Sequence, residues 1–117
     1  MLDLALNNQI INCIKEEVTC QIVELMKSDL VEIILYGSCA RGDFHSDSDI
    51  DIAIITKCNR MDSKKYNKEL ARIATSFAMQ YFAVVNFVCL PYEEYIEKKD
   101  WYPYFSNIER EGQVLYG

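Results

Sequence analysis

Apolar residues recur every three or four positions in three stretches of the chain, the spacing that places them on one face of a helix. The first stretch predicts a helix from about residue 4 to residue 27. The second follows the polar turn 57–63, in which Asp62 or Ser63 is a candidate N-cap. The third lies near the C-terminus, where Gly112 is placed to end a helix. The apolar positions are Ile10, Ile14, Val18, Ile22 and Met26, then Tyr66, Leu70, Ile73, Phe77 and Tyr81, then Trp101, Tyr104, Phe105 and Ile108.

Three apolar runs of strand length alternate with these helical stretches. They cover residues 31–36, 50–55 and 83–90, and Pro91 after the third run suits the first turn of a following helix. The resulting order is helix, strand, short helix, strand, helix, strand and two short helices. This order predicts the α/β (α+β) class, with a small mixed β-sheet and helices packed on it. With 117 residues, the chain is predicted to form a single domain spanning 1–117.

A Gly-Ser pair follows the first predicted strand. Gly37 lacks a Cβ, which lets the backbone approach an anion closely. Ser38 is predicted to cap a short helix that runs through Arg41 and whose first N–H groups favour a phosphate. The guanidinium of Arg41 adds a permanent cation with forked donors. Taken alone, the Gly-Ser pair indicates ordinary turn chemistry.

Two aspartates mark the start of the second predicted strand. In extended backbone Asp49 and Asp51 share one face with Ala53, and the two Asp Cα atoms are ~7 Å apart. The two charges repel each other, and no Lys or Arg within the strand relieves that repulsion. Both carboxylates could instead converge on Mg²⁺. An acidic turn entering a strand is the simpler interpretation, but the combination with the Gly-Ser turn favours a nucleotide and metal site.

Residues 37–51, GSCARGDFHSDSDID, resemble the Gly-Ser-x10-Asp-x-Asp signature of the DNA polymerase β-like nucleotidyltransferase superfamily. Within that superfamily the chain resembles the minimal nucleotidyltransferase (MNT) group, because SNIEREGQVLY at 106–116 is similar to the group's common ending. The resemblance implies a polymerase β-like nucleotidyltransferase core. It also implies an enzyme that transfers a nucleoside monophosphate from an NTP to a hydroxyl and releases pyrophosphate.

The same resemblance implies roles for particular residues. Asp49 and Asp51 match the signature carboxylates, which hold one or two Mg²⁺ ions as cofactors. The family usually has a third carboxylate on the next strand, where this chain has Asn86. An asparagine can offer a carbonyl oxygen to a metal but cannot accept a proton as a base. Asn86 is therefore expected to impair turnover more than it impairs binding of the NTP. The implied nucleotide-binding residues are Gly37, Ser38 and Arg41.

Composition narrows the classes of partner. The net charge is −6 and the isoelectric point about 4.7, which argues against binding long nucleic acid. No apolar stretch approaches the ~20 residues of a membrane span. The N-terminus lacks the basic start of a signal peptide, so a cytoplasmic location is expected. Five cysteines with no CxxC pair, together with a single histidine, cannot form a standard zinc site and indicate reduced thiols.

Three functions remain open at this point. The first is that of an MNT antitoxin that transfers AMP from ATP to a tyrosine of a HEPN-domain toxin, its partner protein in a homo- or hetero-oligomer. The second is a catalytically weakened or inactive module that binds nucleotide or toxin, which Asn86 favours. The third is nucleotidyl transfer to a small molecule such as an aminoglycoside.

Overall fold

The computed structural model describes residues 6–117, and its first element is a long helix, α1, Asn8–Met26. The helix begins where the side chain of Asn7 accepts a hydrogen bond from the N–H of Ile10 at 2.9 Å. The sequence predicts a start near residue 4; residues 4 and 5 lie outside the described range, and 6 and 7 precede the helix. The buried face differs from the predicted one only in using Ile11 where the pattern has Ile10. It consists of Ile11, Ile14, Val18, Ile22 and Met26.

Four strands form one mixed sheet in the order β3-β2-β1-β4. The three predicted strands are present as β1, Leu30–Tyr36, β2, Ile50–Thr56, and β3, Val85–Pro91. β1 pairs with β2 in antiparallel fashion, and β2 pairs with β3 in parallel fashion. A one-turn 3-10 segment, Lys27–Asp29, connects α1 to β1. This small mixed sheet with helices on it is the predicted fold class.

The fourth strand, β4, Gln113–Tyr116, is absent from the predicted order. It pairs with β1 in antiparallel fashion, and three of its four residues are exposed. Gly112 ends the preceding helix as predicted, since its N–H donates to the carbonyl of Ile108 at 2.9 Å. A Cβ at Gly112 would collide with that carbonyl and with the side chain of Ile34. The glycine thus lets the chain turn closely against β1. The short pattern of residues 113–116 does not predict this tertiary contact.

The segment between β2 and β3 holds two helices where one was predicted. α3, Arg60–Ser63, is capped by Asn59, whose side chain accepts from the N–H of Asp62 at 2.8 Å. A 3-10 turn, Lys64–Tyr66, leads into α4, Asn67–Tyr81. The prediction of Asp62 or Ser63 as the N-cap is wrong, because both lie inside α3. Asn59 has the extended backbone that a cap requires, at φ −73° and ψ 174°.

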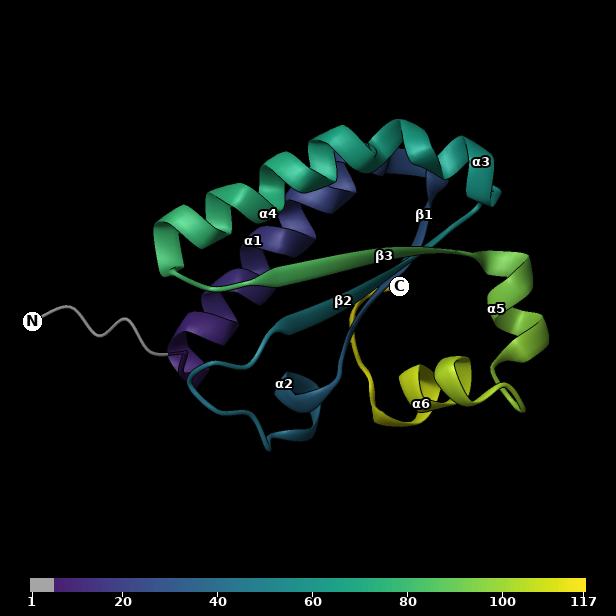
Figure 1. Cartoon of the computed structure of the whole chain (residues 1–117). Coiled ribbons are helices and arrows are strands. Elements are labelled where there is room, and N and C mark those ends of the chain that lie inside the picture. The colour runs from purple at the N-terminus through teal and green to yellow at the C-terminus, as the bar shows by residue number, and fades with distance from the viewer. Residues whose placement is uncertain (1–5) are drawn as a thin grey trace, which may run out of the picture.

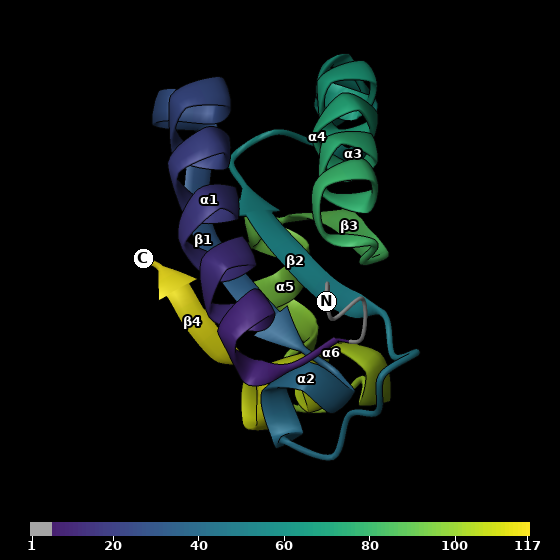
Figure 2. The same cartoon turned by 90° about the vertical axis from the view of Figure 1, so that its left-hand side faces the viewer.

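The two faces of the sheet carry separate apolar cores. Alternation along β2 directs Ile50, Ile52 and Ile54 to the face covered by α1 and α4. Ala53 and Ile55 point to the other face, which α5, Tyr92–Lys98, and α6, Pro103–Glu111, cover. Figures 1 and 2 show these two layers of helices on either side of the strands. Asp51 is two positions from Ala53 and therefore lies on the same face of the sheet, the α5 and α6 side, as the predicted alternation requires.

Pro91 sits one position earlier than predicted, as the last residue of β3 and the N-cap of α5. Its φ of −61° and ψ of 135° continue the strand, and the helix starts at Tyr92. Within residues 6–117, no helix combines the length and the apolar composition that a membrane-spanning segment needs.

Phe77 tests the core between α4 and the sheet. Its side chain is fully buried, so Phe77→Ala should lower the free energy of unfolding by about 3–5 kcal/mol. Urea denaturation followed by circular dichroism measures this change. Met79→Ala on the same helix is the matched control, because Met79 is 77% exposed and the substitution should cost under about 0.5 kcal/mol. Equal losses for the two variants would contradict the assignment of this core.

Candidate nucleotide and metal site

The turn after β1 brings the backbone against a carboxylate of β2. Gly37 has a φ of +78°, a conformation that side-chain-bearing residues rarely adopt. A Cβ at Gly37 would lie 2.7 Å from Oδ2 of Asp51, so only a glycine admits this approach. The carbonyl of Gly37 accepts hydrogen bonds from the N–H groups of Ala40 and Arg41, both at 3.1 Å. The turn and the carboxylate therefore share one small volume.

The short helix that follows, α2, Ser38–Arg41, was predicted with Ser38 as its cap. The prediction is wrong by one position, because Gly37 is the N-cap and Ser38 is the first helical residue. The cap is the residue whose backbone still lies outside the helix, and Gly37 has that backbone. Ser38 is half-buried and remains next to the turn, where the sequence placed it.

Asn86 joins the two aspartates from the neighbouring strand. Its Nδ2 donates to Oδ2 of Asp49 at 3.1 Å and to Oδ1 of Asp51 at 3.2 Å. Asp51 and Asn86 are partners in the parallel register of β2 and β3, which accounts for their proximity. Asp49 directly precedes β2, one residue before the strand that was predicted to carry it. The structure thus brings together the three polar residues that the sequence singled out on these two strands.

The donor set suits a hard cation that is completed by its substrate. Residues 6–117 contain no group of three or more His, Cys, Asp or Glu side chains able to hold a metal. Two carboxylates and one amide oxygen fit Mg²⁺, which commonly takes one or two protein carboxylates and fills its remaining positions with phosphates and water. An N–H donor already stands between Asp49 and Asp51, at the point where a cation would relieve their repulsion. The residues present therefore fit magnesium with a nucleotide and do not form a closed metal cage.

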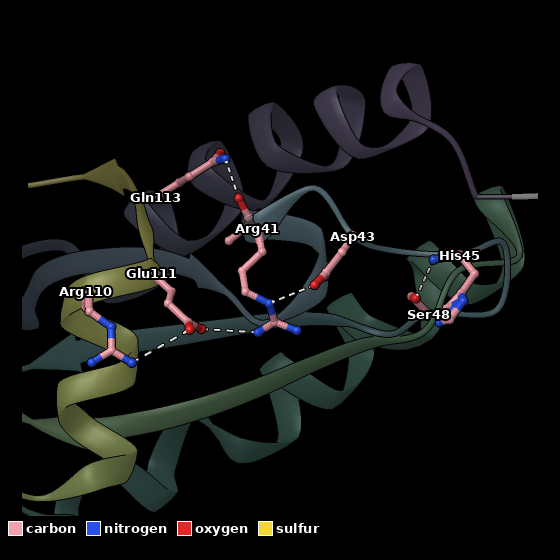
Figure 3. A network of polar contacts seen from close by, with 8 residues as sticks. Arg41, Asp43, His45, Ser48, Arg110, Glu111 and Gln113 are labelled. Carbon is pink, nitrogen blue, oxygen red and sulfur yellow. Dashed lines mark hydrogen bonds and ion pairs between the residues drawn. The ribbon is translucent and has the colours of Figure 1, made fainter.

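Arg41 is held between two carboxylates. Its Nε donates to Oδ2 of Asp43 at 3.2 Å, and its Nη1 donates to Oε2 of Glu111 at 3.1 Å. Figure 3 shows the guanidinium between these side chains, with Arg110 on the far side of Glu111 at 3.9 Å. The hydrogen bond to Asp43 raises the pKa of Arg41, and the one to Glu111 raises it further. The sequence predicts a permanent cation beside the turn, and the structure adds its partners, Asp43 from the link after α2 and Glu111 from α6.

The C-terminal strand also contacts α2. The side chain of Gln113 donates to the carbonyl of Ala40 at 3.1 Å (Figure 3). In the link before Asp49, the N–H of His45 donates to Oγ of Ser48 at 2.8 Å, and the N–H of Ser48 donates to the carbonyl of His45 at 3.0 Å. The two hydrogen bonds between His45 and Ser48 form a tight turn, which sets the direction in which the chain enters β2. His45 itself is exposed, as expected for a loop residue.

Two further residues next to the carboxylates titrate above their usual range. Burial raises the pKa of the Cys39 thiol, and the nearby charge of Asp51 raises it further. Cys39 is buried, and its Sγ donates to the carbonyl of Asp49 at 3.5 Å, which agrees with a lining residue and not with an activated nucleophile.

Sequence reasoning missed Tyr36, which pairs with Asp51 across the β1–β2 ladder. Burial raises the pKa of Tyr36, as does the hydrogen bond between its hydroxyl and that of Tyr104 at 3.1 Å.

A cavity of about 650 Å³ opens beside Asn86, on the side away from Gly37. It runs between β3 and the helices α3 and α4, and its lining includes Arg60 and Lys64. Periodicity along the chain does not predict this cavity, because its volume depends on how far α3 and α4 stand from β3 after they pack.

The fold sets a glycine turn against paired carboxylates at the next strand. Comparison with known proteins identifies the class of transferase to which such a chain belongs. The model of the nucleotidyltransferase domain family matches residues 19–112. The chain belongs to this family, and it is the nucleotidyltransferase that the sequence predicts.

Two archaeal relatives from Methanocaldococcus jannaschii carry a more specific name. The chain is 33% identical over 78 residues to "Putative protein adenylyltransferase MJ0141", covering 67% of this chain and 76% of the relative. It is 31% identical over 106 residues to "Putative protein adenylyltransferase MJ0604", covering 87% of this chain and 98% of the relative.

Two solved structures share the fold. One is a toxin–antitoxin with AMP-PNP, at a TM-score of 0.56 and 20% identity, covering 87% of this chain and 73% of that chain. The other is a mutant of the toxin–antitoxin MntA-HpeT, at a TM-score of 0.53 and 19% identity, with the same coverage of 87% and 73%. These likenesses confirm the predicted fold, a small mixed sheet with helices packed on it.

The close approach at Gly37 gives a matched pair of variants. Gly37→Ala and Gly42→Ala both place a side chain at positive φ, +78° and +86°, and each should lose about 1–2 kcal/mol of stability. No atom lies within 4 Å of a Cβ at Gly42, whereas one at Gly37 meets the Asp51 carboxylate. Gly37→Ala should therefore lose about 1–3 kcal/mol more than Gly42→Ala in urea denaturation. Equal losses would mean that the turn does not abut Asp51.

Proposed function

We propose that this chain transfers AMP from ATP to a tyrosine hydroxyl of a HEPN-domain toxin in a Mg²⁺-dependent reaction, and so acts as the antitoxin of the pair. The observation that carries the proposal is the contact of Asn86 with both Asp49 and Asp51, beside a glycine turn that abuts Asp51. A triphosphate and a divalent cation need this combination of turn and carboxylates.

The chemistry divides between the three strands. The tyrosine hydroxyl attacks the α-phosphorus of ATP in line with the leaving pyrophosphate. Bound Mg²⁺ would stabilise the negative charge on the attacking and leaving oxygens. Asp49 and Asp51 are assigned to hold one or two Mg²⁺ ions. The backbone of Gly37 and the hydroxyl of Ser38 are assigned to the β- and γ-phosphates, with Arg41 as a supporting cation. The contacts of Arg41 with Asp43 and Glu111 would set its position beside the turn.

Names of related proteins support a protein acceptor. The two M. jannaschii relatives are named for protein adenylyltransferase activity, which is transfer of AMP to a protein. The two structural neighbours are toxin–antitoxin complexes, one with the ATP analogue AMP-PNP. The resemblance of the signature and of residues 106–116 to the MNT group joins these two properties in one protein class and supports the HEPN-type partner.

Asn86 favours a second candidate, a module that binds nucleotide and toxin with weak or no turnover. Its amide donates hydrogen bonds to both carboxylates. The amide cannot accept a proton from the attacking hydroxyl. For its oxygen to reach a cation, the amide has to rotate by half a turn. General base catalysis typically contributes a factor of about 10²–10⁴ to a rate, and Asn86 cannot supply it.

Label transfer separates the two candidates. Incubation with ATP labelled at the α-phosphate, Mg²⁺ and a purified HEPN-domain toxin that binds this chain should label the toxin. Asp49→Asn and Asp51→Asn should each reduce the rate at least about 100-fold, because each removes a charge that holds the cation. Asp47→Asn is the matched control, since Asp47 is an exposed carboxylate two residues from Asp49. A toxin that binds tightly without acquiring label would support the binding module and sink the enzyme.

Restoring the missing carboxylate tests the role of Asn86. Asn86→Asp should increase the transfer rate about tenfold or more, because it provides a charged ligand and a base at the position next to both aspartates. Asn86→Ala serves as the control for a merely structural effect of the substitution. If Asn86→Asp and the unmodified protein transfer at equal rates, the amide is not what limits turnover.

Binding of nucleotide can be measured without turnover. Isothermal titration with a non-hydrolysable ATP analogue should show binding that depends on Mg²⁺ and is lost when EDTA is added. Asp49→Asn should weaken the binding strongly, whereas Asp47→Asn should leave it unchanged. Equal affinity with and without Mg²⁺ would argue against cation bridging by these carboxylates.

A further inference from the structure

The outer edge of β3 is an unpaired sheet edge within the part of the chain that the structure describes. The carbonyl of Val84 accepts from the N–H of Ile50 at 2.8 Å, which fixes the direction of the backbone groups along the strand. Because these directions alternate, Val85, Phe87 and Cys89 turn their N–H and C=O groups away from β2. Such a row of free donors and acceptors is a template for a further strand.

The cavity beside Asn86 follows this edge, and we call it the β3 groove. It is bounded by residues 85–89 of β3, by α4 and by the end of α3. Ala71 and Ala74 of α4 face it, and these small side chains leave room next to the strand. Figure 2 shows α3 and α4 standing over β3 on one side of the sheet. An added strand needs about 4.8 Å beside its neighbour, and a volume of about 650 Å³ is sufficient for several residues.

The groove lies where an acceptor must enter. The Gly37 turn follows β1, Asp51 is on β2, and Asn86 is on β3, so the candidate site crosses three adjacent strands in that order. In-line displacement places the attacking hydroxyl opposite the leaving pyrophosphate. With the β- and γ-phosphates at Gly37, the hydroxyl approaches from the side of β3. Asn86 both lines the groove and contacts the two aspartates, which connects the groove to the reacting centre.

Two cations line one end of the groove in an otherwise acidic protein. They are Arg60 and Lys64, and the lining includes no carboxylate, in a chain of net charge −6. Glu94 binds Arg60 through two hydrogen bonds, at 2.6 and 3.0 Å, and this contact places α3 beside the end of β3. Lys64 is exposed at the same end. An acidic side chain on the incoming segment would meet this end of the groove.

The spacing between the two ends can be stated in residues. Asn86 and Cys89 are three positions apart along β3, which is ~10 Å in an extended strand. An odd separation also switches the face of the sheet, from the α5 and α6 side at Asn86 to the α3 and α4 side near Lys64. A segment paired with β3 would therefore carry its hydroxyl and its carboxylate three residues apart.

We infer that the β3 groove binds an extended segment of the acceptor protein by strand addition, with a tyrosine at Asn86 and an Asp or Glu three residues away near Lys64. The inference rests on the proposed transfer to a protein tyrosine and adds where and how that protein is recognised. Backbone pairing supplies affinity, and the acidic residue supplies specificity.

The test uses a library of nine-residue peptides with tyrosine fixed at the centre and the other positions varied. Binding is measured by fluorescence anisotropy with Mg²⁺ and a non-hydrolysable ATP analogue, so the readout does not need turnover. Peptides with Asp or Glu three residues from the tyrosine should bind best. Lys64→Glu should weaken their binding about tenfold and should favour peptides with Lys at that position. Lys68→Glu is the matched control, because Lys68 is exposed on α4 and lies outside the groove lining.

A second pair of variants tests backbone pairing. Cys89→Pro removes an outward N–H without removing a bond to β2, and it should weaken peptide binding about tenfold. Cys89→Val keeps that N–H and should bind more tightly than Cys89→Pro, which separates loss of the backbone donor from loss of the thiol side chain. No binding across the library, or binding that is insensitive to both Lys64→Glu and Cys89→Pro, would overturn the inference.

The two proposals fail in different ways. If the HEPN toxin is labelled at the same rate by the unmodified protein, Lys64→Glu and Cys89→Pro, the transfer stands and the groove is not its acceptor site. If peptides bind with the expected pattern while neither peptide nor toxin acquires label, the groove stands and the transfer fails.

Discussion

Two negative charges held on one face at the start of β2 are the constraint on which the site depends. Asp49 and Asp51 repel each other, and the fold counters this by placing the Asn86 amide between them from the parallel strand β3. The glycine turn after β1 approaches Asp51 from the opposite side. Parallel pairing of β2 with β3 and antiparallel pairing of β1 with β2 are both needed for this convergence. A one-residue slip in either register would turn the partner side chain to the other face.

The C-terminal segment braces the turn. Glu111 at the end of α6 binds Arg41, Gly112 packs against β1, and Gln113 at the start of β4 binds the backbone of Ala40. Glu111 and Gln113 thus connect the last helix and strand to the short helix α2, while Gly112 between them lies against β1. Residues 106–116, which resemble the ending of the MNT group, thus hold the turn at Gly37 and Ser38 in place as well as completing the sheet.

Asn86 is central to both proposals because it stands between the carboxylates and the β3 groove. As a donor it holds the aspartates together, and as a lining residue it marks the side from which a hydroxyl would approach. Its position on the strand next to β2, and not its chemistry, makes it the counterpart of a third carboxylate. Asn86 has the position of such a carboxylate but neither its charge nor its ability to accept a proton, which is why the two candidate functions differ at this residue.

The sequence alone determined the three main strands, the long helices, the fold class and the meeting of Gly37, Asp49 and Asp51, since each rests on local periodicity or on a short, spaced motif. Asn86 was added to this site by the resemblance to the family. It misplaced the caps at Ser38 and Asp62 by a few residues, because a cap depends on backbone angles that several neighbouring residue types tolerate. Tertiary structure alone decided β4, the partners of Arg41 and the β3 groove. A strand of four mostly exposed residues gains its pairing from β1, and ion pairs between residues 70 positions apart leave no periodic trace in the chain.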